Sequence, residues 1–229
     1  MYTFRKIAGT PHLQLSSILA HRGWFLEPSE KNSAIALERA LQNGFGIETD
    51  VRDLNRRLII SHDPPKDSSE LLDLDWLFSL IHSTGSKGRV ALNIKADGLL
   101  NLLMPLRQSS CVGTDQVFAF DMSVPDAISY LESDIPAYSR ISEYEQSPCF
   151  IDQARGVWVD NFTGTFPQVR RAADLMAQGI RAAIVSPELH RRDPLPLWNE
   201  ILESHIYENP LFELCTDLPL QAAEMFCKS

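Results

Sequence analysis

The sequence has no long hydrophobic run. Its apolar stretches fall well short of the roughly 20 residues that a membrane-spanning helix requires. The first segment, residues 1–23, also lacks the continuous apolar stretch of a signal peptide. Both absences predict a chain with no stable insertion in a membrane.

Cysteine is scarce and scattered. The four cysteines, at positions 111, 149, 215 and 227, form no CxxC or Cys/His metal pattern. Disulfides persist mainly in oxidising compartments, so four isolated cysteines favour free thiols in a reducing cytoplasm. We therefore expect a cytoplasmic protein.

Positive charge is also in short supply. Lys and Arg total 21 against 30 Asp and Glu, which gives a formal net charge of −9. Binding to nucleic acid depends on Lys and Arg at the phosphate backbone, so this balance argues against a nucleic-acid partner. A small anionic substrate is still compatible, because a local cationic pocket or a bound metal outweighs the global field. The oligomeric state is left open.

Short β-rich runs alternate with amphipathic stretches along the chain. Apolar residues make up 44% of the 229 residues, enough for a sizeable core. The predicted strands are 17–21, 46–52, 90–95, 116–120, 136–140, 156–160, 181–186 and 211–215. The amphipathic stretches include 33–43, 99–108, 124–132, 167–178 and 194–204.

This alternation predicts an α/β fold, a (β/α)8 TIM barrel formed as a single domain over residues 1–229. No low-complexity linker or break in composition divides the chain. A doubly wound open sheet is the rival fold. That fold expects a G-x-G-x-x-G turn after its first strand, where this sequence reads HRGWFLEPSEKN over 21–32.

Local signals mark the first helix and a hairpin. Asn32 is a predicted N-cap for the helix over 33–43, and Asn43-Gly44 predicts its exit. A shorter β-rich run, 58–62, follows the turn-like 55–57. It is expected to pair with the second strand as a hairpin extension.

Polar residues occupy the ends of the first two strands, where barrel enzymes place their chemistry. The first strand ends in His21-Arg22-Gly23. Glu48 and Asp50 are two residues apart in the second strand, so both side chains project from the same face. Such a pair is either a solvated strand face or a pair of oxygen ligands for Mg²⁺ or Ca²⁺. The surrounding strand is of a buried type, where unpaired carboxylates are costly, and this favours the ligands.

A longer motif includes these residues. From Leu19 to Asp63 the sequence contains HRG, a loop, Asn-Ser at a helix start, Gly, E-x-D-V and finally HD. This order resembles the signature region of the glycerophosphodiester phosphodiesterase family, whose relatives include the phosphoinositide-specific phospholipases C. Two later pieces agree with it. The segment 93–95 lies where the family has E-x-K, and 216–219 resembles its T-D-x-P.

The resemblance implies the reaction and its residues. His21 and His62 match the family's two catalytic histidines, one a general base and the other a general acid. Arg22 and Lys95 match the cations that hold the phosphate. The implied substrate is a small-molecule phosphodiester.

The resemblance also implies a divalent metal, Mg²⁺ or Ca²⁺, with Mn²⁺ as an alternative. Glu48 and Asp50 match metal-binding carboxylates, and Asn93 stands where the family has a third one. An amide oxygen coordinates without a negative charge, so affinity for the ion should fall. Glu188 either compensates as an additional ligand or belongs to a surface loop after the seventh strand.

Two further acidic residues follow strands. Asp160 is interpreted either as a substrate contact or as a cap of the next helix. Asp217 is expected to order the loop after the last strand rather than to take part in chemistry.

Two functions from different classes follow. The first is a metal-dependent phosphodiesterase that hydrolyses a glycerophosphodiester, or a similar diester, by histidine acid–base catalysis. The second is a divergent barrel that binds a phosphorylated ligand without turnover. The two histidines, the two cations and the E-x-D pair favour the enzyme, whereas Asn93 favours the binding protein. A diesterase acting on a carbohydrate or lipid-linked polymer is a third, weaker hypothesis.

Overall fold

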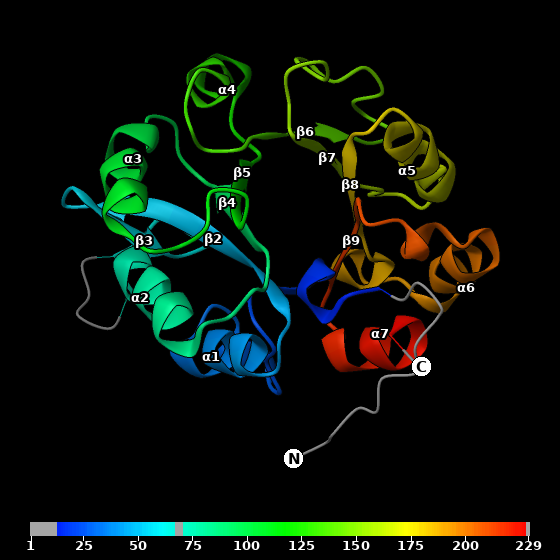
Figure 1. Cartoon of the computed structure of the whole chain (residues 1–229), viewed down its shortest axis with the longest axis horizontal. Helices are drawn as coiled ribbons and strands as arrows, with labels where there is room; N and C mark the ends of the chain where they lie inside the picture. The colour runs from blue at the N-terminus through cyan, green and yellow to red at the C-terminus, as the bar shows by residue number, and fades with distance from the viewer. Residues whose placement is uncertain (1–12, 67–70, 228–229) are drawn as a thin grey trace.

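Eight parallel strands form a barrel with helices around its outside (Figure 1). The structure, a computed structural model, describes residues 13–66 and 71–227. The barrel strands are β1 (Ile18–His21), β2 (Gly46–Leu54), β4 (Val90–Ile94), β5 (Val117–Phe120), β6 (Tyr138–Ile141), β7 (Gly156–Val159), β8 (Arg181–Val185) and β9 (Phe212–Thr216). This arrangement confirms the predicted (β/α)8 TIM barrel.

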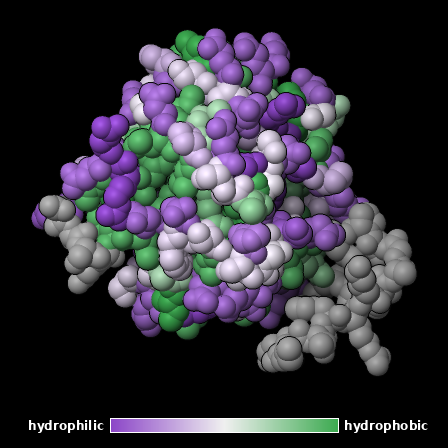
Figure 2. Space-filling view, turned by 60° about the vertical axis from the view of Figure 1, so that its left-hand side comes forward, coloured by the Kyte–Doolittle hydropathy of each residue, from purple (hydrophilic) through white to green (hydrophobic). Residues whose placement is uncertain are grey.

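Helices follow most of the strands. The α-helices are α1 (Ala34–Gln42), α2 (Leu74–Thr84), α3 (Leu100–Ser109), α4 (Val124–Leu131), α5 (Gln168–Ala177), α6 (Leu195–Ser204) and α7 (Pro219–Phe226). Short 3-10 turns are η1 (Leu15–Ser17), η2 (Pro28–Glu30), η3 (Pro187–His190) and η4 (Ile206–Glu208). In the described part of the chain, no helix has the length and apolarity needed to cross a bilayer. On the face shown in Figure 2, polar side chains interrupt the apolar patches.

The order around the barrel is β5-β4-β2-β1-β9-β8-β7-β6. β1 pairs with β2 on one side and with β9 on the other, so the first and last strands are neighbours. β5 and β6 meet at an isolated bridge between Ala119 and Ala137, which closes the ring. The strand β3 (Arg57–Ile60) pairs antiparallel with β2 and confirms the predicted hairpin.

The first helix begins one residue later than the sequence predicts. Ser33 is the N-cap of α1, and its side chain accepts a hydrogen bond from the Ala36 N–H at 3.3 Å. The prediction that Asn32 caps this helix is therefore wrong. The backbone of Asn32 has a φ of 60°, and its side chain is bound elsewhere. The predicted exit is confirmed, since Asn43 is the C-cap and Gly44 follows with a φ of 83°.

The inside of the barrel is filled by side chains. Two stacked aromatic pairs span it, Phe118 with Tyr138 at 3.8 Å and Phe120 with Trp158 at 4.0 Å between ring centroids. The remainder is filled by Leu19, Ala91, Ala183, Val185 and Cys215, as expected in a barrel interior that is a packed core and not a pore. A functional site must therefore lie at one end of the barrel.

The amino-terminal end is closed by a buried ion cluster. Glu213 of β9 is fully buried, and its carboxylate lies 2.8 Å from Arg89 Nε and 3.6 Å from an Arg181 nitrogen. The Tyr138 hydroxyl donates to the same carboxylate at 3.0 Å. Burial raises the pKa of Tyr138 well above its ordinary value, so this hydroxyl stays neutral and remains a donor. We regard this end as structural, because barrel chemistry sits at the opposite face.

Candidate active site

Six of the predicted site residues gather at the carboxyl ends of β1, β2 and β4: His21, Arg22, Glu48, Asp50, Asn93 and Lys95. Register explains why they meet. His21 lies beside Glu48 across the β1–β2 pair, and Asp50 lies beside Asn93 across the β2–β4 pair. Lys95 directly follows β4. Residues from three separate segments of the sequence therefore occupy one side of the barrel mouth.

A carboxylate positions the imidazole of His21. Its Nδ1 lies 2.6 Å from Asp217 Oδ1, and its Nε2 lies 3.9 Å from Glu48 Oε2. Lys31 Nζ donates to the other oxygen of Asp217 at 3.0 Å. Burial raises the pKa of Asp217, but the hydrogen bonds and charges of His21 and Lys31 outweigh it and bring this pKa below its ordinary value. The ionised Asp217 thus fixes the ring and leaves Nε2 on the side of Glu48.

Sequence reasoning assigned Asp217 to loop order and missed this contact. The predicted barrel topology contained a signal for the contact between His21 and Asp217. In a closed barrel the last strand pairs with the first, and Thr216 lies beside Ala20. The residues that follow these two are Asp217 and His21, so closure brings them together.

Glu188 holds the segment that carries Asp217. One of its carboxylate oxygens accepts hydrogen bonds from the Thr216 hydroxyl at 2.5 Å and from the Asp217 N–H at 3.0 Å. The other oxygen accepts a hydrogen bond from the Ser186 hydroxyl. These contacts assign Glu188 a positioning role at the ends of β8 and β9. Its role as an additional metal ligand stays a prediction.

Asp50 is the centre of a buried polar cluster. It is fully buried, and Arg22 Nε lies 2.9 Å from one carboxylate oxygen while Lys95 Nζ lies 3.3 Å from the other. The Asn32 amide donates to Asp50 at 2.8 Å, and its carbonyl oxygen accepts from the Thr49 hydroxyl at 2.8 Å. Asn32 is thus a site residue that was mistaken for a cap. Its left-handed backbone, which asparagine tolerates better than most residues, explains the shift.

The turn after β1 brings Arg22 over the site. Arg22 has a φ of 57°, and its N–H donates to the backbone oxygen of Glu48 at 2.8 Å. Gly23 follows with a φ of 87° and packs directly against the start of α1. A Cβ at Gly23 would lie 2.7 Å from the Ala36 carbonyl carbon. The HRG order therefore has a steric reason as well as a chemical one.

Glu48 lies between the imidazole and the Asp50 cluster. Its side chain is 1% exposed. Burial raises its pKa, the positive charge of His21 opposes this, and the neighbouring Asp50 raises the pKa further. Glu48 consequently gains a proton more readily than an exposed glutamate. A cation bound at this carboxylate would favour the loss of that proton.

The donor atoms fit a divalent cation. Asp50 Oδ1 and Asn93 Oδ1 are both buried and accept no hydrogen bond from the described residues. Together with Glu48 they supply two carboxylates and an amide, the hard oxygen ligands that Mg²⁺ and Ca²⁺ prefer. Within residues 13–66 and 71–227, no group of three or more His, Cys, Asp or Glu forms a metal site. An ion here would therefore depend on the amide of Asn93 and would compete with Lys95 for Asp50.

His62 lies at the edge of this cluster. The Ser61 N–H donates to the Asp50 backbone oxygen at 3.1 Å, so the hairpin holds residue 62 beside β2. The His62 side chain is 47% exposed, and its Nδ1 lies 2.8 Å from Asp63 Oδ1. Its position at the rim suits contact with an outward-facing part of a ligand. Its acid–base role stays a prediction.

Asp160 lies on the opposite side of the mouth, at the end of β7. It accepts hydrogen bonds from His190 Nε2 at 2.7 Å and from the Asn161 N–H at 2.8 Å. Phe162 packs on the His190 ring with centroids 4.9 Å apart. The next helix, α5, has Pro167 as its N-cap residue, so the structure does not use Asp160 as that cap. Contact with a substrate stays the open prediction for this residue.

The His21–Asp217 contact predicts a pH-dependent stability. The lowered pKa of Asp217 means that its contribution is present above the ordinary value of 3.8 and is lost as pH falls through the lower folded value. Replacing Asp217 by Asn should therefore destabilise the protein at pH 7, and the difference from wild type should shrink as pH falls from 5 to 3. Denaturant unfolding across this range measures it. The control Asp174→Asn, at an exposed position on α5, should show no such trend. If the loss of unfolding free energy in Asp217→Asn is the same at every pH, the account is contradicted.

Three comparisons with known proteins bear on the fold. No family model and no curated sequence matches the chain. A structure from Galdieria sulphuraria, described as a candidate glycerophosphodiester phosphodiesterase, matches with a TM-score of 0.71, 17% identity and coverage of 93% of this chain and 98% of that one. An Oleispira antarctica phosphodiesterase in complex with the product sn-glycerol-3-phosphate matches with a TM-score of 0.65, 14% identity and coverage of 91% and 96%.

A glycerophosphoryl diester phosphodiesterase from Parabacteroides distasonis also matches, with a TM-score of 0.64, 14% identity and coverage of 95% of this chain and 87% of that one. These likenesses extend over nearly the whole chain at low identity. They show that this chain has the barrel fold of these proteins.

Proposed function

We propose that this chain is a divergent glycerophosphodiester phosphodiesterase that hydrolyses a glycerophosphodiester or a similar small phosphodiester. The observation that carries the proposal is the imidazole of His21, oriented by Asp217 toward a buried cluster of two cations and two carboxylates. The shared barrel fold supports it, since chemistry in such barrels sits at this end of the strands.

Arg22 and Lys95 would bind the phosphate. Both now neutralise Asp50, and neither side chain is fully buried, so each can also reach a ligand at the mouth. The planar guanidinium suits two phosphate oxygens at once, and the ammonium acts as a point charge. Their shared anchor on Asp50 holds them in place before the substrate arrives, which limits the entropy lost on binding.

The two histidines would transfer the protons. His21 Nε2 takes a proton from the attacking water as the new P–O bond forms. The carboxylate of Asp217 stabilises the resulting imidazolium. His62 gives its proton to the alcohol oxygen as the other P–O bond breaks. Each proton transfer of this kind contributes about 10²–10⁴-fold to the rate.

Glu48, Asp50 and Asn93 would hold the divalent cation. When bound, such an ion stabilises negative charge on the phosphoryl oxygens. Two buried oxygens support this part of the proposal: Asn93 Oδ1 accepts no hydrogen bond from the described residues, and Asp50 Oδ1 has only the ion pair with Lys95.

The direct test is hydrolysis of glycerophosphodiesters and of an aryl phosphodiester, each with Mg²⁺, Ca²⁺ or Mn²⁺ and each with a chelator. We expect turnover with at least one ion and its loss in the chelator. Full activity in the chelator would remove the metal from the mechanism. Failure of the folded protein to cleave any diester with any ion would overturn the proposal.

One observation favours a second candidate, a barrel that binds a phosphorylated ligand without turnover. Asn93 leaves two carboxylates at the cation site in place of three. In that case sn-glycerol-3-phosphate should raise the melting temperature. The same protein should release no product from any diester.

The metal site makes a separate prediction at Asn93. The substitution Asn93→Asp adds a carboxylate of the same shape beside Asp50, so it should tighten binding of the ion about tenfold, or about 1.4 kcal/mol. The readout is the rise in melting temperature with Mg²⁺ or Ca²⁺ alone, compared with wild type. Without the ion, the added charge next to Asp50 should lower the melting temperature.

The matched control is Asn101→Asp, which adds the same charge at an exposed position on α3. Its response to the ion should equal that of wild type. An equal response in Asn93→Asp would show that this side chain does not take part in ion binding.

A further inference from the structure

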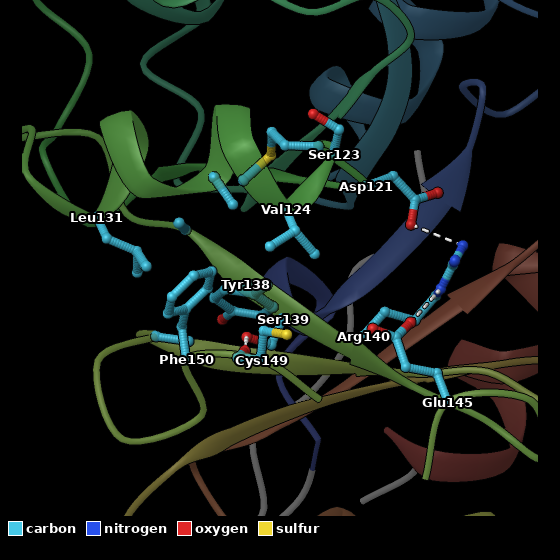
Figure 3. A pocket seen from close by; sticks show the side chains of 14 residues that line it. Asp121, Ser123, Val124, Leu131, Tyr138, Ser139, Arg140, Glu145, Cys149 and Phe150 are labelled. Atoms are coloured by element: carbon cyan, nitrogen blue, oxygen red, sulfur yellow. Dashed lines mark hydrogen bonds and ion pairs between the residues drawn. The ribbon is translucent and has the colours of Figure 1, made fainter. Parts of the chain in front are cut away.

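A cavity of about 260 Å³ lies between helix α4, strand β6 and the loop over residues 142–155 (Figure 3). β5 and β6 meet here at an isolated bridge. A barrel strand is normally followed by a helix that covers the next seam. In the described stretch 142–155 no α-helix follows β6, so the loop covers this seam instead.

The loop wall is tied to the barrel. The Ser139 hydroxyl of β6 donates to the backbone oxygen of Cys149 at 2.7 Å. Phe150, the next residue, lines the cavity from the loop side. On the other side the first residue of α4, Val124, and its last, Leu131, line it. The cavity therefore has fixed walls on three elements.

The cavity is apolar at one end and polar at the other. Figure 3 shows Leu131 and Phe150 at one end and Asp121, Arg140 and Glu145 at the opposite end. Arg140 lies 3.0 Å from an Asp121 oxygen and 3.5 Å from a Glu145 oxygen. Two carboxylates thus exceed the charge of the one guanidinium. This end does not attract a second anionic group, which favours an uncharged, apolar occupant.

The polar end adjoins the catalytic side of the mouth. Phe120, the last residue of β5, lies beside Asn93 of β4 in register. Asp121 follows Phe120 as Lys95 follows the end of β4, so both lie at the same edge of two neighbouring strands. Burial raises the pKa of Asp121, and the positive charges of Arg140 and Lys95 oppose this rise, which agrees with the closeness of Lys95. A ligand held at Lys95 can therefore extend past Asp121 toward the seam.

We propose that this seam cavity binds an apolar group carried by the alcohol of the phosphodiester substrate, while the phosphate lies at Arg22 and Lys95. The inference rests on the proposed function and specifies its substrate class. An apolar protein cavity of roughly 150 Å³ takes up benzene, and pockets for drug-sized ligands begin at roughly 300 Å³. A cavity of 260 Å³ thus accepts a hydrocarbon group of about six to ten carbons.

The test is a series of glycerophosphodiesters whose second alcohol is a straight alkyl chain of two, four, six or eight carbons. Each buried methylene should raise kcat/KM about threefold to fourfold, up to the length that fills the cavity. The variant Ala127→Trp fills the cavity from α4 and should abolish this dependence, with the two-carbon diester hardly affected. Ser129→Trp, on an exposed position of the same helix, should retain it.

A second variant covers the case in which Ala127→Trp does not fold. Leu131→Ala enlarges the apolar end, so the optimum should move to a longer chain. Rates that do not depend on chain length in wild type would overturn the inference. Equal slowing of all chain lengths by Ala127→Trp would also overturn it.

Failure of the proposed function gives a different result, because then no diester of any length is cleaved. In that case, binding of octyl phosphate and ethyl phosphate is compared by calorimetry. Tighter binding of octyl phosphate that is lost in Ala127→Trp supports the cavity. Equal binding of octyl phosphate and ethyl phosphate overturns the inference. Octanol that binds as tightly as octyl phosphate without competing with it also overturns the inference, because the alkyl chain then binds elsewhere.

Discussion

Replacing His21 by alanine is expected to lower kcat on any diester substrate by about 10²–10⁴-fold, the usual contribution of a positioned acid or base. The loss should fall mainly on kcat, because Arg22 and Lys95 remain to bind the phosphate. The His21 side chain is only 15% exposed and contacts Asp217, so its removal should also lower the melting temperature, and kcat is measured at a temperature where the variant is folded. Steady-state kinetics together with a melting curve measure both effects.

Two variants make this prediction specific. His82→Ala removes an exposed histidine on α2 and should leave kcat unchanged. Asp217→Asn keeps the size of the side chain but removes the charge that holds His21, so it should lower kcat by less than His21→Ala and change the pH profile. Wild-type kcat in the His21→Ala protein would exclude this imidazole from the reaction.

The sequence alone was sufficient to predict that Glu48 and Asp50 share one face of their strand and that His21 ends the neighbouring strand. In Glu48 and Asp50 the two-residue spacing places both side chains on one face, and the structure shows both buried on that face. His21 is the last residue of a short apolar run, and the predicted strand 17–21 therefore ends at the same residue as β1. These inferences succeed because the information is local, within one strand or at its end.

Contacts that depend on closure of the barrel could not be predicted from local sequence. Asp217 lies 196 positions from His21 in the sequence, and their contact follows from the pairing of the last strand with the first. The role of Asn32 depends on a single backbone angle, because a φ of 60° turns its side chain from the helix start toward Asp50. In the sequence, an asparagine that caps a helix cannot be distinguished from one whose amide hydrogen-bonds to a buried carboxylate.

Helix α2 was not among the amphipathic stretches named from the sequence. Its sequence, LDWLFSLIHST, places apolar residues so closely that they fit several registers, and this obscures the helical period. The structure resolves the ambiguity through packing, since Leu74, Leu77, Phe78 and Ile81 are the buried face. These positions follow a helical spacing once the polar residues between them are seen to face solvent.

Removing the carboxylate at the opposite end of the barrel should affect stability rather than turnover. The substitution Glu213→Ala leaves Arg89, whose side chain is 14% exposed, without its buried counter-ion. Breaking a buried pair in this way costs about 3–5 kcal/mol. The Tyr138 hydroxyl also loses its acceptor. Denaturant unfolding should show this loss in the free energy of unfolding.

The exposed glutamate Glu203 on α6 provides the matched control, and Glu203→Ala should change stability by no more than about 0.5 kcal/mol. Folded Glu213→Ala protein should retain wild-type kcat/KM, because Glu213 lies at the amino-terminal end of β9 and Asp217 follows its carboxyl end. A stability loss below about 1 kcal/mol would mean that water solvates Arg89 in place of the lost carboxylate. A fall in kcat/KM without a loss of stability would contradict the assignment of stability to the amino-terminal end of the barrel and of chemistry to its carboxyl-terminal end.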